Sequence, residues 1–184
     1  MQAGRTFMRE IEGIKEAMKL LEPYWTDIED DFLHHNTRFL ELAATDHDIL
    51  GRVLRSHLVV ENFLNSYLQA TFGFDDLDDL RLSFAQKAKM LPSAQASAAF
   101  IRPGVIQLNK IRNKFGHTLT HAIELAEINL ITQILDIARP STTFAEPIEA
   151  IEAFAPIACA FLSVPPKHLE EAFLEAFKTV RWES

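Results

Sequence analysis

Cysteine is almost absent from this 184-residue chain, which contains only Cys159. One cysteine can form neither an internal disulfide nor a cysteine-based zinc site. Glycine is also scarce, at six residues, and none of them lies in a G-x-G-x-x-G or G-x-x-x-x-G-K pattern. The phosphate-binding loops of Rossmann and P-loop proteins need glycines in those patterns, so the sequence disfavours both classes of nucleotide-binding protein.

Positive charge is in deficit, because 18 lysines and arginines face 26 acidic residues and the formal net charge is −8. A general nucleic-acid binder usually carries a basic face, since neutralising phosphate supplies most of its affinity. An acidic chain must therefore gather its positive charge locally or bind something else. The middle of the chain does hold a cluster of cations, which comprises Arg52, Arg55, Arg81, Lys87, Lys89, Arg102, Lys110, Arg112 and Lys114.

Long hydrophobic runs are missing as well. Residues 1–7 contain an arginine that no apolar segment follows, unlike a secretory signal. The most apolar later run, residues 156–164, is too short to span a bilayer. These features predict a soluble, cytoplasmic protein that does not act at a membrane.

No stretch alternates apolar and polar residues as strands do, whereas apolar residues recur at three- and four-residue spacings. The sequence therefore predicts an all-α fold. Thr26 and Glu29 form a predicted capping box at the start of the second helix. Helices are expected at about 5–21, 26–42, 48–72, 80–91, 103–117 and 120–138, followed by two that begin at Pro147 and at 165–166.

We expect three parts in the chain. Residues 1–45 are predicted to form N-terminal helices that pack on a bundle. Residues 46–140 are predicted to form the core, an antiparallel helical bundle. Residues 141–184 are predicted to form a proline-containing linker and a C-terminal extension of two helices, which packs on the bundle or on a second subunit.

The polar end of the helix predicted at 103–117 reads R-N-K-F-G-H over residues 112–117. Metal-free cleavage of RNA needs a base for the 2′-hydroxyl proton and a cation for the phosphorane charge. His117 can serve as the base, and the guanidinium of Arg112 matches phosphate geometry. On an unbroken helix the two side chains would point about 140° apart, so Gly116 is expected to end the helix and turn the chain.

This motif in its helical setting resembles the R-x4-H signature of the HEPN superfamily, all-helical proteins that include many RNases and toxins. The resemblance covers about residues 46–140. It implies a HEPN-like bundle and a metal-independent endoribonuclease, of toxin or phage-defence type, with a composite cleft between the two protomers of a homodimer. Leu119 stands where one toxin branch of the family has a tyrosine, so regulation through that tyrosine is not expected.

The resemblance also assigns roles to individual residues. Arg112 would bind the scissile phosphate, His117 would transfer a proton, and Asn113 would orient them. Lys110 and Lys114 are the candidate residues for binding the rest of the RNA. The alternative for the Arg112–His117 pair is purely structural, since a cation at a helix end can pair with acids and cap carbonyls.

Two residues of the helix predicted at 48–72 are candidates for supporting the motif. Glu61 lies on an apolar stripe, where an ionised carboxylate is costly without a partner, so we expect it to face Arg112 or His57. His57 is expected to be buried and hydrogen-bonded rather than catalytic. No metal or cofactor is predicted, because the paired Glu-x-x-His and H-E-x-x-H patterns of metal-binding helices are absent.

A second resemblance leads to a different class of function. The run from Leu80 to Leu91, followed by an I-R-N helix end, is similar to that of mannitol-operon-repressor-like helical proteins. It implies a non-enzymatic regulatory module that acts through a protein partner, an antitoxin or a regulator. The nuclease hypothesis expects Arg112 and His117 in an exposed, concave, positive cleft. The regulatory hypothesis expects them to be buried or engaged with Glu61, with the apolar face of residues 48–72 forming an interface. A third possibility is that the C-terminal helices cover the motif.

Overall fold

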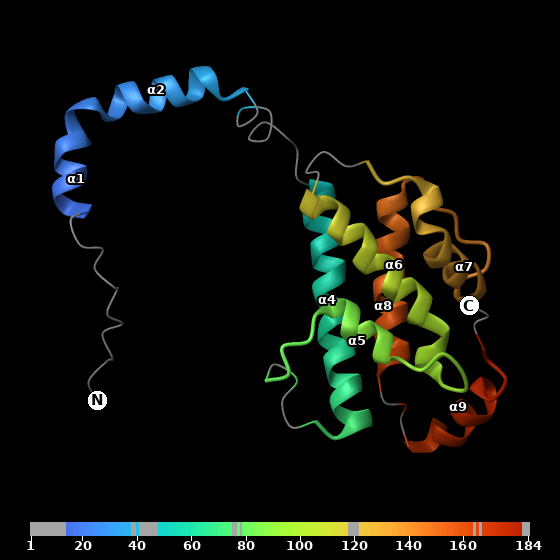
Figure 1. Cartoon of the computed structure of the whole chain (residues 1–184). Helices are drawn as coiled ribbons and strands as arrows, with labels where there is room; N and C mark the ends of the chain where they lie inside the picture. Colours follow the sequence, from blue (N-terminus) through green and yellow to red (C-terminus); the bar gives the residue numbers. More distant parts are fainter. Residues whose placement is uncertain are drawn as a thin grey trace. The chain divides into compact units, whose positions relative to one another are not determined.

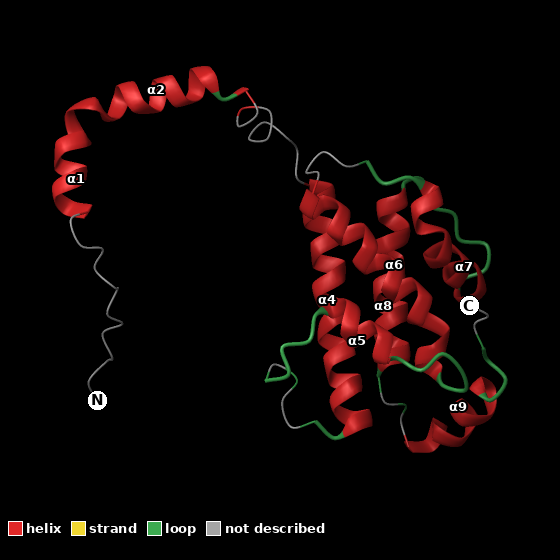
Figure 2. Ribbon diagram, in the orientation of Figure 1, coloured by secondary structure: helices red, strands yellow, loops and turns green. Residues whose placement is uncertain are grey.

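The computed structural model describes residues 14–37, 40, 48–74, 77, 79–117, 122–163, 165 and 167–181. The chain divides into two compact units, Met1–Thr45 and Asp46–Ser184. All of the secondary-structure elements in the described residues are helices, so the predicted all-α helical bundle is confirmed (Figure 2). The one extended pairing in this part of the chain is an isolated bridge between Ala94 and Arg181.

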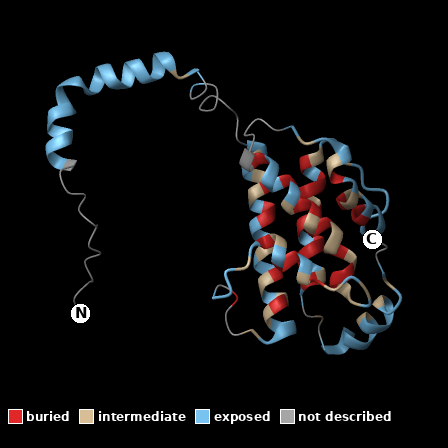
Figure 3. Ribbon diagram, in the orientation of Figure 1, coloured by how far each residue is buried: buried red, intermediate tan, exposed pale blue. Residues whose placement is uncertain are grey.

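The first unit contains α1 (Ile14–Leu21), the 3-10 turn η1 (Glu22–Tyr24) and α2 (Trp25–His35). Pro23 lies in the first turn of η1 and ends α1 as expected, because proline lacks the N–H that an α-helix needs. The predicted capping box is wrong, since the chain passes directly from η1 into α2 and Thr26 lies inside the helix. The described side chains of this unit are almost all exposed (Figure 3). That it packs on the bundle stays a prediction.

The second unit is a helical bundle in which α4 and α8 run side by side (Figure 1). Its first helix, α4, has the bounds that the sequence predicts, and its most extensive contact is with α8. The elements in chain order are α4 (Asp48–Phe72), α5 (Phe84–Met90), α6 (Ser97–His117), η2 (Leu125–Ile128), α7 (Asn129–Ala138), α8 (Pro147–Leu162), η3 (Lys167–Leu169) and α9 (Glu170–Phe177).

The core lies between α4, α6, α7 and α8, and each of these helices contributes one buried apolar stripe (Figure 3). A Cβ atom on Gly104 would lie 2.6 Å from ring atoms of Phe154 and 2.8 Å from Cδ1 of Ile134. Glycine therefore lets α6 approach its neighbours closely. The fully buried large side chains include Leu64, Leu68, Ile101, Leu108, Ile111, Ile128, Ile131, Ile134, Leu135, Ile151 and Phe154.

Several helices begin elsewhere than predicted, among them α9, which begins at Glu170 rather than at 165–166. α6 begins at Ser97 instead of Pro103, because burial of Ala98 and Ala99 favours the extra turn and the helix tolerates the proline. α5 begins at Phe84, after a capping box of Ser83 and Gln86, rather than at the acidic turn before it. α7 begins at Asn129, about nine residues later than expected.

α8 is part of the core rather than an extension of it. Ile151, Phe154 and Ala158 are fully buried, and the helix packs along α4, α6 and α7. The expected division after residue 140 is therefore replaced by one compact unit that runs to the end of the chain. No described helix is by itself long and apolar enough to cross a membrane; α8 and residues 167–177 meet that test only as a pair bent by 90°.

Candidate functional site

The polar end of α6 carries the motif on an exposed surface. Ile111 and Phe115 are buried on one side of the helix and hold it against the core. Arg112 and Asn113 face solvent, and Nη1 of Arg112 donates a hydrogen bond to Oδ1 of Asn113 at 3.2 Å. Lys110 is exposed on the same stretch. The structure therefore places the candidate phosphate-binding arginine and its orienting asparagine side by side and open to a ligand.

The expected break at Gly116 is absent. The helix includes both Gly116 and His117, so it does not turn between Arg112 and His117. Positions five apart on a regular helix lie about 140° apart around its axis. The side chain of His117 and the whole of Leu119 and His121 lie outside the described residues.

A buried polar cluster lies beneath this surface, between α4, α5 and α6. Nε2 of His57 is 3.4 Å from the accepting Oδ1 of Asn109, and Nδ1 of His57 is 3.9 Å from Oε2 of Glu61. Nζ of Lys87 donates to Oε1 of Glu61 at 3.2 Å. Lys87 and His57 are each only 5% exposed, and the ring of Phe84 stacks on that of His57 at 4.0 Å between centroids.

Burial favours the neutral form of His57. Burial lowers the pKa of His57 below its ordinary value of 6.5, and the charge of Arg112 lowers it further. The hydrogen bond to Asn109 and the carboxylate of Glu61 act in the opposite direction but are outweighed. His57 is thus buried and within hydrogen-bond distance of Asn109, and that it is not catalytic stays a prediction.

Glu61 faces His57, as one of the two predicted arrangements requires. Its close partner, however, is Lys87, one of the cations in the middle of the chain. Arg112 instead lies one helical turn after Asn109, and so on the edge of the cluster. The cluster thus connects α4 and α5 to the stretch of α6 that presents the motif.

Four of the nine central cations already have a carboxylate partner. Arg52 and Arg55 both pair with Glu152, Lys87 pairs with Glu61, and Lys114 pairs with Glu127. The partner of Lys114 comes from η2, so its charge is already engaged. Of the motif's own cations, Lys110 and Arg112 are therefore the better placed to meet phosphate.

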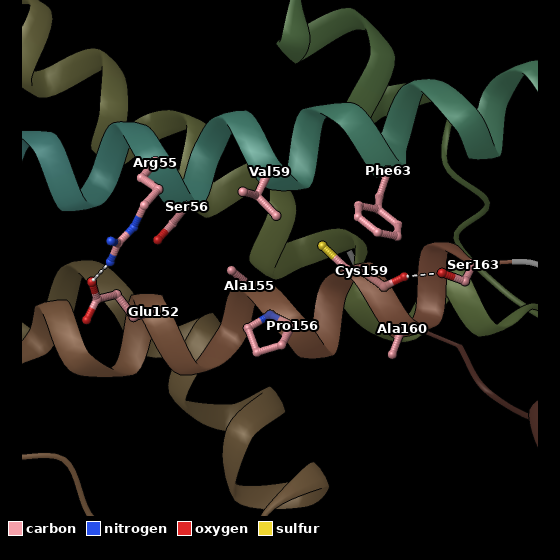
Figure 4. Close-up of a pocket in the computed structure, with 10 residues that line it drawn as sticks. All are labelled: Arg55, Ser56, Val59, Phe63, Glu152, Ala155, Pro156, Cys159, Ala160 and Ser163. Carbon is pink, nitrogen blue, oxygen red and sulfur yellow. Dashed lines mark hydrogen bonds and ion pairs between the residues drawn. The ribbon is translucent and has the colours of Figure 1, made fainter.

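A second candidate surface is a groove of about 540 Å³ between α4 and α8. Val59 and Phe63 point from α4 toward α8, and Ala155 and Cys159 point back (Figure 4). Val59 is 44% exposed and Phe63 is 37% exposed, which is unusual for apolar residues on a central helix. This is the apolar face of residues 48–72 that the regulatory hypothesis expects at an interface.

The ion pair of Arg55 and Glu152 lies at one end of this groove. Arg52 donates to both carboxylate oxygens of Glu152, at 3.1 and 2.7 Å. Arg55 donates to Oε1 of Glu152 at 2.7 Å (Figure 4). These hydrogen bonds lower the pKa of Glu152 and raise that of Arg52. Burial raises the pKa of the Cys159 thiol, so this cysteine is a poor nucleophile.

The C-terminal segment lies at the opposite end of α6 from the motif. The N–H of Gln95 donates to the carbonyl of Val180 at 2.9 Å, just before α6 begins. The ring of Phe177 lies 5.6 Å from that of Phe161, which in turn contacts Phe100 in the first turn of α6. From Ser97 to Arg112 a helix rises about 22 Å, so α9 does not cover the described part of the motif.

Among the described residues, no group of three or more histidine, cysteine, aspartate or glutamate side chains is arranged to hold a metal ion. Comparison with protein-family models, with curated proteins and with solved structures finds no match to this chain. The site therefore has to be interpreted from its own geometry.

Sequence reasoning missed three polar residues that organise this region. Lys87 shares the buried side of α5 with Phe84 and Ala88, and a lysine in that apolar register was the available signal. Asn109 and Gln107 gave no such signal, because an amide on a helix is ordinary. Their partners lie on other elements, which only the fold brings near.

Proposed function

We propose that the second unit is a HEPN-type, metal-independent endoribonuclease, a cytoplasmic toxin or phage-defence component that acts as a homodimer. The observation that supports this best is the exposed, hydrogen-bonded pair of Arg112 and Asn113 on α6. A guanidinium held by a neighbouring amide keeps donors free for a bidentate contact with phosphate. The buried cluster around Asn109 holds that part of α6 against α4 and α5.

The reaction needs no metal and no water. His117 accepts the proton of the RNA 2′-hydroxyl, and the 2′-oxygen attacks the adjacent phosphorus. Arg112 stabilises the negative charge that develops on the phosphorane oxygens. The bond from phosphorus to the 5′-oxygen then breaks, and the leaving oxygen takes a proton from a protonated histidine. The products are a 2′,3′-cyclic phosphate and a 5′-hydroxyl.

The continuity of α6 favours a site made by two chains. Because positions 112 and 117 lie about 140° apart around one continuous helix, a phosphate would be held by Arg112 of one protomer and meet His117 of the other. Such a composite cleft would exist only in the dimer. Asn113 would orient Arg112, and Lys110 would bind a flanking phosphate.

The experiment that tests this function is an RNA cleavage assay in EDTA with the full chain. We expect wild type to cut structured RNA and the Arg112→Ala variant to lose about 10²–10³-fold in rate, as removal of a charge-stabilising donor does. Lys89→Ala, which removes an exposed cation from α5, is the matched control and should cut normally. If wild type that is shown to be dimeric leaves the RNA intact, the nuclease proposal fails.

The second candidate function is a non-enzymatic, mannitol-operon-repressor-like regulatory module. The observation that favours it is the apolar groove between α4 and α8, where Val59 and Phe63 remain exposed (Figure 4). A groove lined by small residues such as Ala155 can take the apolar face of a partner helix. The net charge of −8 also suits a protein partner better than a nucleic acid.

Phe63→Lys separates the two functions, because it places a charge in the groove and leaves the end of α6 unchanged. Under the regulatory hypothesis, a partner that is cross-linked to the wild-type groove is lost from Phe63→Lys, and neither protein cuts RNA. Under the nuclease hypothesis, Phe63→Lys cuts RNA like wild type. Arg112→Ala then has the larger effect on cleavage.

A further inference from the structure

We propose that a pocket between the end of α7, α8 and the C-terminal segment binds an amphipathic monocarboxylate, of the chemical class of a medium-chain fatty acid. The pocket has a volume of about 500 Å³. That volume falls in the range of small-molecule sites, about 300–1,000 Å³. The proposal does not depend on the function of the end of α6.

The walls of this pocket are apolar and largely aromatic. Phe100, Phe161 and Phe177 come from α6, α8 and α9 and meet edge to face, with centroids 5.2 and 5.6 Å apart. Ile137 lines the mouth and is 67% exposed, although it is a large apolar side chain. A bound alkyl chain would cover it and remove that apolar surface from water.

One cation stands at the rim of these apolar walls. Arg139 is the only charged residue among the described residues that line the pocket. Its backbone is fixed, because its N–H donates to the carbonyl of Leu135 at 2.7 Å and ends α7. Its guanidinium forms no ion pair with a carboxylate of the described residues, Asp136 on the preceding turn included.

The single positive charge in an otherwise uncharged lining indicates the class of ligand. A guanidinium fork pairs with a carboxylate through two parallel hydrogen bonds. A single arginine matches one negative charge, whereas a phosphate dianion would need further cations. An apolar pocket with one cation in its lining therefore fits an alkyl chain that ends in a carboxylate.

The C-terminal segment supplies one wall, so the ligand would also bind it to the bundle. Phe177 and Val180 line the pocket from this segment. The segment is held in place by the hydrogen bond from the N–H of Gln95 to the carbonyl of Val180 and by the bridge from Ala94 to Arg181. A ligand that contacts both sides should suppress opening of this segment, because it binds only the closed form.

The test is calorimetric titration of the full chain with dodecanoate, kept below its micelle concentration. We expect wild type to bind it and Arg139→Gln to bind it about tenfold or more weakly. Lys178→Gln is the matched control, because it removes a cation from the same C-terminal segment outside the pocket, and it should bind like wild type. Dodecanol, which has the chain without the charge, should bind wild type and Arg139→Gln equally weakly.

Hydrogen exchange supplies an independent readout of the location. Dodecanoate should slow exchange at the amides of Gln95 and residues 170–181 in wild type. Ile137→Glu, which adds a negative charge at the mouth, should abolish both the slowing and the heat of binding. The proposal is overturned if dodecanoate does not bind, if Arg139→Gln binds it like wild type, or if Phe63→Lys in the α4–α8 groove abolishes binding instead.

Discussion

The two halves of α6 use their polar residues in opposite ways. In the first half, Gln107 is buried, and its Oε1 accepts hydrogen bonds from the N–H groups of Leu130 and Ile131, both at 2.9 Å. In the second half, Arg112 and Asn113 bond to each other and face solvent. One helix thus helps to complete the fold through Gln107, at its middle, and presents an exposed polar surface near its end. Substitutions in the first half should act on stability, and those at the exposed end on function.

The largest effect on stability in this comparison should come from Gly104→Ala. The added methyl group would lie 2.6 Å from the ring of Phe154, so helices or side chains must shift. Overpacking of this kind costs about 1–3 kcal/mol in the free energy of unfolding, which urea denaturation measures.

Gly51→Ala is the matched control for that substitution. A Cβ atom on Gly51 meets nothing within 4 Å, and the residue lies inside α4. Alanine there should stabilise the protein by about 0.5–1 kcal/mol through its better helix propensity. If both glycine variants change the unfolding free energy in the same direction, the close contact between Gly104 of α6 and Phe154 of α8 is contradicted.

Gln107→Ala should come next. The substitution leaves two backbone N–H groups at the start of α7 without their acceptor, and the buried amide of Gln107 no longer donates to Oδ1 of Asn129. Leaving such groups unpaired costs about 1–3 kcal/mol. Gln133→Ala, an exposed glutamine on α7, should change the unfolding free energy by less than about 0.5 kcal/mol. Equal losses in the two variants would show that Gln107 does not cap α7.

The smallest effect should be a change in the pH dependence of stability in His57→Gln. Burial lowers the pKa of His57 in the folded protein below 6.5, so the unfolded chain takes up this proton first as the pH falls. The stability associated with His57 is therefore present above about pH 6.5 and is lost as the pH falls toward the folded pKa.

Denaturation at about pH 7.5 and about pH 5.5 measures this loss. The decrease in unfolding free energy should be smaller in His57→Gln than in wild type. His168→Gln, in the exposed turn η3, should keep the wild-type decrease. Identical pH profiles for wild type and His57→Gln would contradict the assignment of a buried neutral histidine.

The sequence was sufficient for the long elements and insufficient for those that depend on distant partners. The bounds of α4 follow from an acidic residue at its start, Asp48, and from the long apolar stripe that comes after it. The start of α7 could not be predicted, because the cap that stabilises it is Gln107, more than twenty residues earlier. The start of α6 was misplaced because the local preference of Pro103 was outweighed by burial of Ala98 and Ala99.

For the candidate site too, the sequence indicated the motif on α6 but not its contacts with other elements. Of the two arrangements that the sequence left open for Arg112, exposed or buried, the structure has the exposed one, and Arg112 donates to Asn113. The pairing of Lys114 with Glu127 and of Lys87 with Glu61 depends on how η2 and α5 pack, which periodicity does not encode. Fewer of the central cations are free of a carboxylate partner than their number in the sequence suggests.

The measurement that tests the central proposal most directly is complementation between two inactive variants. Arg112→Ala and His117→Ala are each expected to lose RNA cleavage alone. If the site is composite, each mixed dimer contains one intact pair of Arg112 and His117 where wild type has two, and random refolding makes about half of the dimers mixed. Unfolding and refolding the two variants together should therefore restore up to about a quarter of the wild-type rate. Wild type that cuts RNA while the mixture stays as inactive as its parts would contradict a site formed between two chains.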